Sequence, residues 1–226
     1  TGIVVTVVNS KGENFSCRSI GANRILGRDE VECAAAEQHI GSSDAMLIED
    51  CVPQQAAVAA IRSAQVHKVR VVFSAKLSQP SREVVNSLDW PMEYYNADIL
   101  VLRFKGLMCA SELGAGGEGD LKLIGTELVA HGAKCVVISL GWRGALVIDR
   151  QGSRHLPGIP LEVVDQNGCD SAFTGALTAC FATGDTPERA VRFAIAAESL
   201  VRSRFGLQEA MPRKEEILTA LQGQPD

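Results

Sequence analysis

The chain lacks the sequence features of several large protein classes. Its seven cysteines include no Cys-x-x-Cys pair and no zinc-ligand spacing with the four histidines, which argues against a disulfide framework or a structural zinc site. An odd number of free thiols is typical of a reducing compartment, so we expect a cytoplasmic protein. No apolar run reaches membrane-spanning length, and the first residues lack a signal-peptide pattern, so we expect no membrane partner.

An excess of positive charge is also absent. The net charge is −5, and no run of lysine and arginine exceeds two residues, whereas proteins that bind nucleic acid carry basic patches. We therefore expect no nucleic-acid partner. Phosphate compounds such as nucleotides stay compatible with this charge, because backbone amides bind phosphate without cationic side chains.

What the sequence does contain is the pattern of an α/β domain. With 226 residues, 46% hydrophobic and 22% charged, the chain is long enough for one domain with a substantial core. Short apolar runs alternate with segments that suit helices, such as 53–66 and 120–131, which predicts a doubly wound, mostly parallel sheet with helices on both faces. These runs are Met46–Ile48, Val69–Phe73, Ile99–Leu102 and Cys135–Leu140.

Antiparallel hairpins and a helical end complete the predicted order of elements. Residues 3–8 and 13–17 form one predicted hairpin, and residues 145–149 and 153–156 form the other. Helices are predicted over 171–183, from Pro187 to just before Gly206, and over 213–221, with Thr186 as a helix cap. No linker or repeat divides the chain, so 1–226 is predicted to be a single domain. The apolar strand pattern starts directly at Thr1, and we expect the natural start to lie upstream.

The segment Val163–Leu177 carries the clearest chemical signal. A strand pattern passes through a polar, glycine-containing turn into an apolar helix, and the free N–H groups at such a helix start suit a phosphate. In the alternative interpretation, Asp170 or Ser171 is a simple helix cap. Cys169, in the same turn, is either a reactive thiol or a small residue that fits the space.

This segment resembles, without a gap, the signature D-T-T-G-A-G-D-A-F-x-G-A-L of the ribokinase-like (PfkB-type) carbohydrate kinase family. The matches are Asp165, Gly168, Ala172, Phe173, Gly175, Ala176 and Leu177. The resemblance extends along the chain in order. Further matching segments are Thr1-Gly2 with Gly12-Glu13-Asn14, Gly21-Ala22-Asn23, Ser139-Leu140-Gly141 with Gly144, Arg192-Phe193-Ala194, and Gly206-Leu207-Gln208.

The resemblance implies an enzyme that transfers the γ-phosphoryl group of ATP to a sugar hydroxyl. The implied cofactors are ATP, Mg²⁺ and, as in many family members, a monovalent cation such as K⁺. The implied partners are a nucleotide and a sugar, with a second copy of the chain in a homodimer. Residues 1–20 correspond to a remnant of the family's lid hairpin, and about the first third of the family's chain, which holds a sugar-binding segment, has no counterpart.

The resemblance also assigns individual residues. It implies an anion hole formed by the amides of Gly168, Cys169 and Asp170, and a monovalent-cation ligand at Asp165. It implies nucleotide contacts at Ser139, Gly141 and Gly144, which lie in one loop. We expect a cleft between this loop and the helix start near residue 168.

Several positions depart from the family pattern. Ser171 stands where the family has its catalytic aspartate, and a serine hydroxyl is a poor base, so the base contribution of roughly 10²- to 10⁴-fold should be lost. Asp170 stands where a glycine belongs, and a one-residue shift of the turn would let Asp170 act as the base. The family's N-x-x-E, which helps to hold hydrated Mg²⁺, corresponds to Arg103 and Gly106.

The sugar side of the site departs too. If the chain is aligned on Pro53, the carboxylate expected to contact the sugar falls on Cys51, although Glu49 and Asp50 are close by. The asparagine of the family's N-P-A-P turn falls near Ser74.

Two main hypotheses follow: an ATP-dependent carbohydrate kinase with impaired activity, with Asp170 or Ser171 as the catalytic residue, and a non-catalytic pseudokinase that binds a nucleotide or a protein. A third is a decaying gene product without function. The G-x-G-x-x-G run at 114–119 is interpreted as a surface loop, because it lies too far from the preceding strand to bind a dinucleotide.

Overall fold

The computed structural model describes residues 2–8, 14–78, 89–104 and 117–222. Within these residues the main sheet has six strands in the order in which they follow along the chain. Neighbours from β3 to β6 are parallel, and β7 and β8 complete the sheet as an antiparallel hairpin. The strands are β3 (Ala45–Glu49), β4 (Arg70–Leu77), β5 (Ile99–Phe104), β6 (Cys135–Ser139), β7 (Gly144–Asp149) and β8 (Gly152–Pro157).

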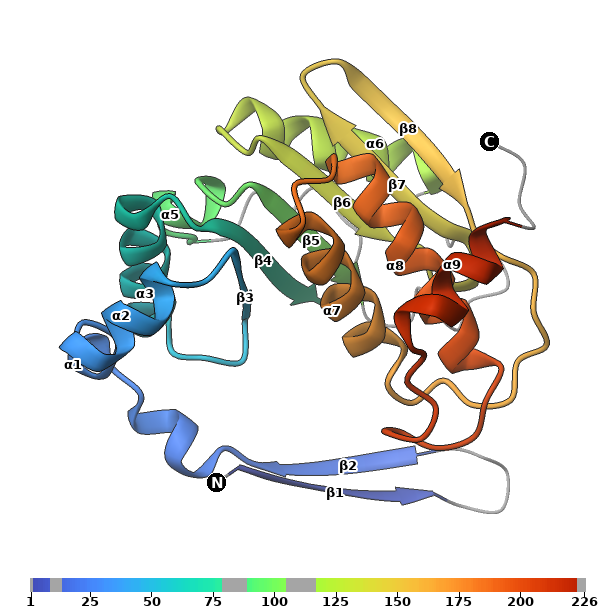
Figure 1. Cartoon of the computed structure of the whole chain (residues 1–226), viewed down its shortest axis with the longest axis horizontal. Helices are drawn as coiled ribbons and strands as arrows, with labels where there is room; N and C mark the ends of the chain where they lie inside the picture. Colours follow the sequence, from blue (N-terminus) through green and yellow to red (C-terminus); the bar gives the residue numbers. More distant parts are fainter. Residues whose placement is uncertain (1, 9–13, 79–88, 105–116, 223–226) are drawn as a thin grey trace.

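Helices cover both faces of this sheet (Figure 1). Crossovers between consecutive parallel strands keep one hand, so the helices of these crossovers share a face; they are α3 (Gln54–His67), α5 (Met92–Tyr95) and α6 (Gly117–Ala130). The other face is covered by helices that follow the sheet in sequence: α7 (Cys169–Ala182), α8 (Pro187–Arg202) and α9 (Lys214–Gln222). The predicted doubly wound, mostly parallel fold with antiparallel hairpins is confirmed.

Two apolar cores, one on each face, hold the layers together. Successive residues of a strand point to opposite faces, so Phe73 packs with the α3 and α6 side, and its neighbour Val72 packs with the α7 and α8 side. Both side chains are fully buried. A strand that is buried on both faces has a continuous run of apolar residues, and for this reason the parallel strands could be predicted from the sequence.

Some element boundaries differ from the prediction. β4 continues to Leu77, beyond the apolar run, because it stays paired with β5 through its polar end. α6 already begins at Gly117, so the interpretation of 114–119 as a loop is wrong for 117–119, and 114–116 lie outside the described residues. α8 ends at Arg202, before Gly206. α1 (Arg28–Val31) and α2 (Ala34–Gly41) were not predicted, since both are short.

The N-terminal hairpin lies apart from the main sheet. β1 (Ile3–Val8) pairs with β2 (Asn14–Ser19) in antiparallel register, and Figure 1 shows this ribbon extending beside the body of the domain. Its apolar side chains are open on both faces, with Ile3 62% exposed on one face and Val4 57% exposed on the other. A turn of 3-10 helix, η1 (Gly21–Ile25), leads from it to α1. No helix among the described residues is both long and apolar enough to cross a membrane.

Candidate nucleotide and phosphoryl-transfer site

The start of α7 is built by a tight turn. Asp165 accepts hydrogen bonds from the backbone N–H and the side-chain amide of Asn167, both at 2.9 Å. Gly168 then takes a left-handed φ of 83°, and a Cβ there would lie 2.9 Å from Cε of Met211, so glycine is the residue that fits. No side chain caps this helix start; the backbone N–H of Cys169 donates to the carbonyl of Gln166 at 3.5 Å, and the first turn lies at the positive end of the helix dipole. Val163 and Val164 lie in an exposed loop rather than in the predicted strand.

Polar side chains of three neighbouring strands lie beneath this helix start. Glu49 ends β3, Lys76 lies near the end of β4, and Arg103 lies near the end of β5. Parallel strands bring their carboxyl ends to one edge of the sheet, and α7 lies over β3 and β4 at this edge. Asp170, in the first turn of α7, completes a group that we call the charge cluster: Glu49, Lys76, Arg103 and Asp170.

Arg103 is the centre of the charge cluster. Its side chain is only 8% exposed; Nη2 donates to Oε2 of Glu49 at 3.2 Å, and Nη1 lies 3.5 Å from Oδ2 of Asp170. Nζ of Lys76 lies 3.3 Å from the same Oδ2 and is half exposed. A buried guanidinium between two carboxylates compensates charges that would otherwise be costly to bury. The cluster therefore combines two anions with two cations.

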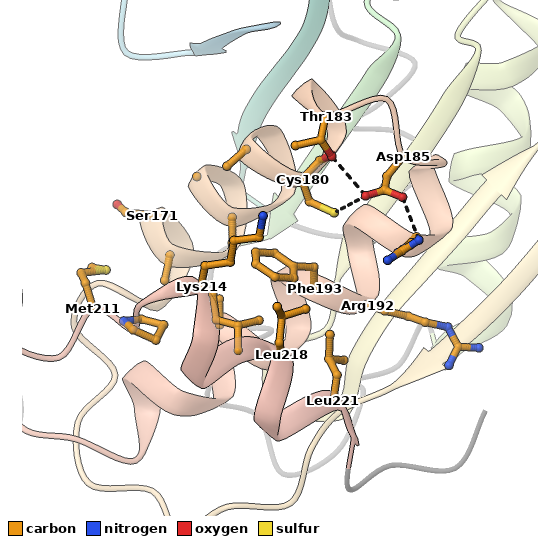
Figure 2. A pocket seen from close by; sticks show the side chains of 18 of the residues that line it. Ser171, Cys180, Thr183, Asp185, Arg192, Phe193, Met211, Lys214, Leu218 and Leu221 are labelled. Atoms are coloured by element: carbon orange, nitrogen blue, oxygen red, sulfur yellow. Dashed lines mark hydrogen bonds and ion pairs between the residues drawn. The ribbon is translucent and has the colours of Figure 1, made fainter. Parts of the chain in front are cut away.

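Adjacent residues of α7 face in different directions, since each residue turns the helix by about 100°. Asp170 points toward the strand ends, where Lys76 and Arg103 contact it. Ser171, the residue that the ungapped resemblance puts at the catalytic position, is exposed on the outer side of α7 (Figure 2). Of the two predicted catalytic residues, the structure therefore brings Asp170 to the cluster and not Ser171.

Glu49, not Cys51, reaches the site from β3. Oε1 of Glu49 accepts a hydrogen bond from Thr174 of α7 at 3.2 Å, whereas Cys51 is exposed. Asp50 is engaged with the backbone N–H of Lys76 at 2.7 Å. Alignment on Pro53 missed Glu49, although its position at the end of an apolar strand pointed to this edge of the sheet. Ser74, also singled out in the sequence, is fully buried in β4, and its Oγ has no hydrogen-bond partner among the described residues.

The predicted nucleotide loop follows β6 at the same edge of the sheet. Oγ of Ser139 accepts a hydrogen bond from the backbone N–H of Gly141 at 3.4 Å. Gly144 has a φ of 97°, and a Cβ there would overlap the carbonyl oxygen of Leu156, so the loop packs closely on the end of β8. Trp142 is 47% exposed at the turn of the loop. Ser139, Gly141 and Gly144 thus lie together in one short, tightly packed turn.

A second buried ion pair lies behind the helix start. Glu198 and Arg202 of α8 are almost fully buried and are joined at 2.9 Å. Burial raises the pKa of Glu198 to about 7 despite the attraction of Arg202. Cys169 is completely buried beside this pair, and burial raises the pKa of its thiol to about 11. The thiolate is therefore disfavoured, which supports the interpretation of Cys169 as a small residue that fits rather than as a reactive thiol.

Asp165 lies against the loop after α8. Its Oδ2 accepts a hydrogen bond from the backbone N–H of Gly206 at 3.4 Å, and its own N–H donates to the carbonyl of Arg202 at 3.1 Å. The residue predicted to bind a monovalent cation is thus placed where two loops meet.

A groove of about 890 Å³ lies on the far side of α7, between α7, α8 and α9 (Figure 2). Its wall includes Ser171, Phe193 and Leu218, with Lys214 among its charged residues. Neither Gly168 nor the Ser139 loop lines it. This groove is therefore not the predicted cleft between those two segments.

Comparison with known proteins agrees with the fold and the signature. The sequence profile of the pfkB family of carbohydrate kinases matches residues 1–214. The ribokinase of Haemophilus influenzae is 26% identical over 227 aligned residues, which cover 98% of this chain and 69% of that protein. This chain therefore belongs to the pfkB family of carbohydrate kinases.

Solved structures show the same fold. The ribokinase of Thermotoga maritima superposes with a TM-score of 0.78 at 23% identity, covering 99% of this chain and 70% of that one. The ribokinase of Arabidopsis thaliana, solved with ribose and ATP, superposes with a TM-score of 0.81 at 21% identity, again over 99% of this chain and 70% of that one. The sheet and its helices are thus those of a ribokinase-like fold.

The charge cluster does not suit the Mg²⁺ that the family implies. Mg²⁺ requires oxygen ligands in a nearly octahedral arrangement, but both carboxylates of the cluster are paired with Arg103. No group of three or more histidine, cysteine, aspartate and glutamate side chains among the described residues could hold a metal ion. The resemblance aligned Arg103 with the family's metal-linked asparagine, and Gly106, which it aligned with the glutamate, lies outside the described residues.

Proposed function

We propose that this chain is a ribokinase-like, ATP-dependent carbohydrate kinase with impaired phosphoryl transfer. The observation that supports the proposal best is the position of Asp170, in the uncapped first turn of α7 and above the carboxyl ends of β3, β4 and β5. In open α/β sheets, ligands bind outside these strand ends. The amides of Gly168, Cys169 and Asp170 would contact the transferred phosphate, and the loop of Ser139, Gly141 and Gly144 would contact the nucleotide.

Among the residues that the structure describes, Asp170 is the one placed to accept the proton of an attacking hydroxyl. Its carboxylate points toward the strand ends, and its Oδ1 has no hydrogen-bond partner among the described residues. Lys76 and Arg103 both contact Oδ2, so part of this carboxylate is already engaged by cations. We therefore expect slow proton transfer. Positioning and charge stabilisation supply most of the catalysis in phosphoryl transfer, so some activity can survive a poor base.

A non-catalytic pseudokinase is the second candidate. The observation that favours it is that Arg103 holds Glu49 and Asp170 together, and these are the two carboxylates that could otherwise serve a sugar and a proton transfer. Such a protein would keep the helix start for nucleotide binding or present its surface to a protein partner. Fold and chemistry are separable, so family membership does not decide between the candidates.

The proposal includes the ligands and partners of the site. ATP would be the nucleotide, with Mg²⁺ carried by its phosphates rather than held by the charge cluster. K⁺ would bind beside Asp165, and a sugar would be the acceptor. Residues 1–20 would act as a lid hairpin on a single domain spanning 1–226, and the exposed apolar faces of β1 and β2 support a homodimer through this hairpin. We propose a cytoplasmic location.

Calorimetric titration with ATP and an assay of ADP release with ribose test the proposal. We expect ATP binding, together with slow, ribose-dependent ADP release that Asp170→Ala abolishes and Ser171→Ala leaves in place. Loss of turnover with Ser171→Ala alone would assign the proton transfer to Ser171 instead. Binding without turnover would support the pseudokinase, and absence of ATP binding would contradict both candidates.

A further inference from the structure

We propose that Lys76 and Arg103 supply the positive charge of the anion site, so that this chain binds ATP without needing a divalent cation. The inference rests on the nucleotide site proposed above and adds to it the source of the charge. Lys76 would contact the phosphates. Arg103 would act as a positioning residue that neutralises Asp170 and Glu49.

The position of Arg103 suits this role. β5 places Arg103 on the same face of the sheet as Val101, which packs in the core beneath α7 and α8. Its guanidinium is buried between the two carboxylates. Its Nε is also buried and has no hydrogen-bond partner among the described residues, so the guanidinium retains an unused donor at the site.

Asp170 makes this neutralisation necessary. Its carboxylate lies within the first turn of α7, next to the amides that would receive a phosphate. An unpaired carboxylate there would repel an incoming polyphosphate. Arg103, together with the half-exposed Lys76, removes that repulsion.

Lys76 has the freedom to contact a ligand. Its ammonium is half exposed and lies 3.3 Å from Asp170, and a lysine side chain can move from a carboxylate to a phosphate without disturbing the fold. When Lys76 moves, Arg103 stays in contact with Asp170, and its single charge is then shared between Asp170 and Glu49. The resulting phosphate site consists of one mobile ammonium and the uncapped amides of α7.

A bound divalent cation fits this arrangement poorly. It would have to displace Arg103 from Glu49 or Asp170 in order to gain a carboxylate oxygen, and it would then lie close to two positive side chains. One explanation accounts both for the poor fit of Mg²⁺ and for the two cations of the cluster: the side chains supply the positive charge that a metal ion would otherwise supply.

The test is calorimetric titration with ATP in excess EDTA and in excess Mg²⁺. For the unmodified chain we expect the two dissociation constants to agree within about threefold, a small difference on the free-energy scale. Arg103→Gln should weaken binding in EDTA by about tenfold or more, as expected when a charge-assisted interaction is lost. Excess Mg²⁺ should recover part of this loss, because Arg103 then no longer occupies Glu49 and Asp170.

Matched variants keep the test independent of folding. Arg62→Gln removes an exposed arginine that pairs with Glu93 at 2.5 Å between α3 and α5, and it should leave ATP binding unchanged. Lys76→Gln changes a half-exposed side chain and should weaken binding in EDTA even if Arg103→Gln fails to fold. Thermal unfolding of each variant shows which of them are folded.

The outcomes separate this inference from the proposed function. ATP binding that requires Mg²⁺ in the unmodified chain overturns the inference and leaves the nucleotide site standing. Unchanged affinity in EDTA for folded Arg103→Gln and Lys76→Gln overturns it as well. Absence of ATP binding under both conditions overturns the nucleotide site, and the inference with it.

Discussion

The buried carboxyl of Glu198 should make the stability of this protein fall as the pH rises from about 4.5 to about 7. The side chain is 1% exposed, and burial, the largest influence, raises its pKa from the usual 4.5 to about 7. Arg202, at 2.9 Å, acts in the opposite direction, and Asp170 raises the pKa further. Oε2 of Glu198 has no hydrogen-bond partner among the described residues, so little else stabilises the charged form.

The sign and size follow from proton linkage. The folded state binds the proton more tightly than the unfolded chain, so its advantage is complete below pH 4.5 and is lost as the pH passes 7. One pKa unit corresponds to about 1.4 kcal/mol, so the full difference is about 3 kcal/mol in the free energy of unfolding. Cys169, which also lies beside Glu198, stays protonated throughout this range, because burial raises its pKa to about 11.

Urea denaturation at pH values on both sides of this window measures the effect. Glu198→Gln removes the titrating group, so its free energy of unfolding should vary with pH by about 3 kcal/mol less than that of the unmodified chain. Glu188→Gln is the matched control, since Glu188 lies on the same helix but is exposed, and it should keep the original pH profile. Parallel pH profiles for the unmodified chain and Glu198→Gln would refute the reasoning.

Three further predictions concern stability and are checked by urea denaturation or thermal unfolding. Gly144→Ala should lower the free energy of unfolding by more than about 2 kcal/mol, because its Cβ would overlap the carbonyl oxygen of Leu156. Gly175→Ala should raise the free energy of unfolding by about 0.5 to 1 kcal/mol, because Gly175 lies in the middle of α7 with open space around its Cβ position. Thr186→Ala removes the cap of α8, at which Oγ1 accepts a backbone hydrogen bond at 3.3 Å, and should cost about 1 kcal/mol. Phe73→Ala should cost about 3 to 5 kcal/mol, because the ring is fully buried; equal stability of any of these variants and the original chain would contradict its prediction.

The sequence alone determined the order and type of the main elements. Apolar runs of strand length, separated by helical segments, predicted the parallel strands, because strands buried on both faces leave a continuous apolar signature. Thr186 before Pro187 marked the start of α8. The threonine side chain accepts a hydrogen bond from the backbone N–H of Arg189, and proline suits the first helical position because it has no N–H that would need a partner. The short helices α1 and α2 escaped prediction, because four to eight residues give too little periodicity.

The sequence also located the start of α7 but left open whether Asp170 or Ser171 points toward the strand ends. An ungapped motif alignment uses only the order of residues along the chain, and it placed Ser171 at the catalytic position. The direction of a side chain depends on how the helix is rotated on the sheet, and one residue corresponds to about 100°. Packing of Phe173 and Leu177 against the core sets that rotation, and it turns Asp170 toward the strand ends.

Tertiary structure alone decided which charges meet. Glu49, Lys76, Arg103 and Asp170 are far apart in the sequence, and nothing local indicates that they pair. They meet because parallel pairing brings the ends of β3, β4 and β5 to one edge and α7 starts above it. An arginine that counted in the sequence as a lost metal-binding position is, in the fold, the buried partner of two partly exposed carboxylates.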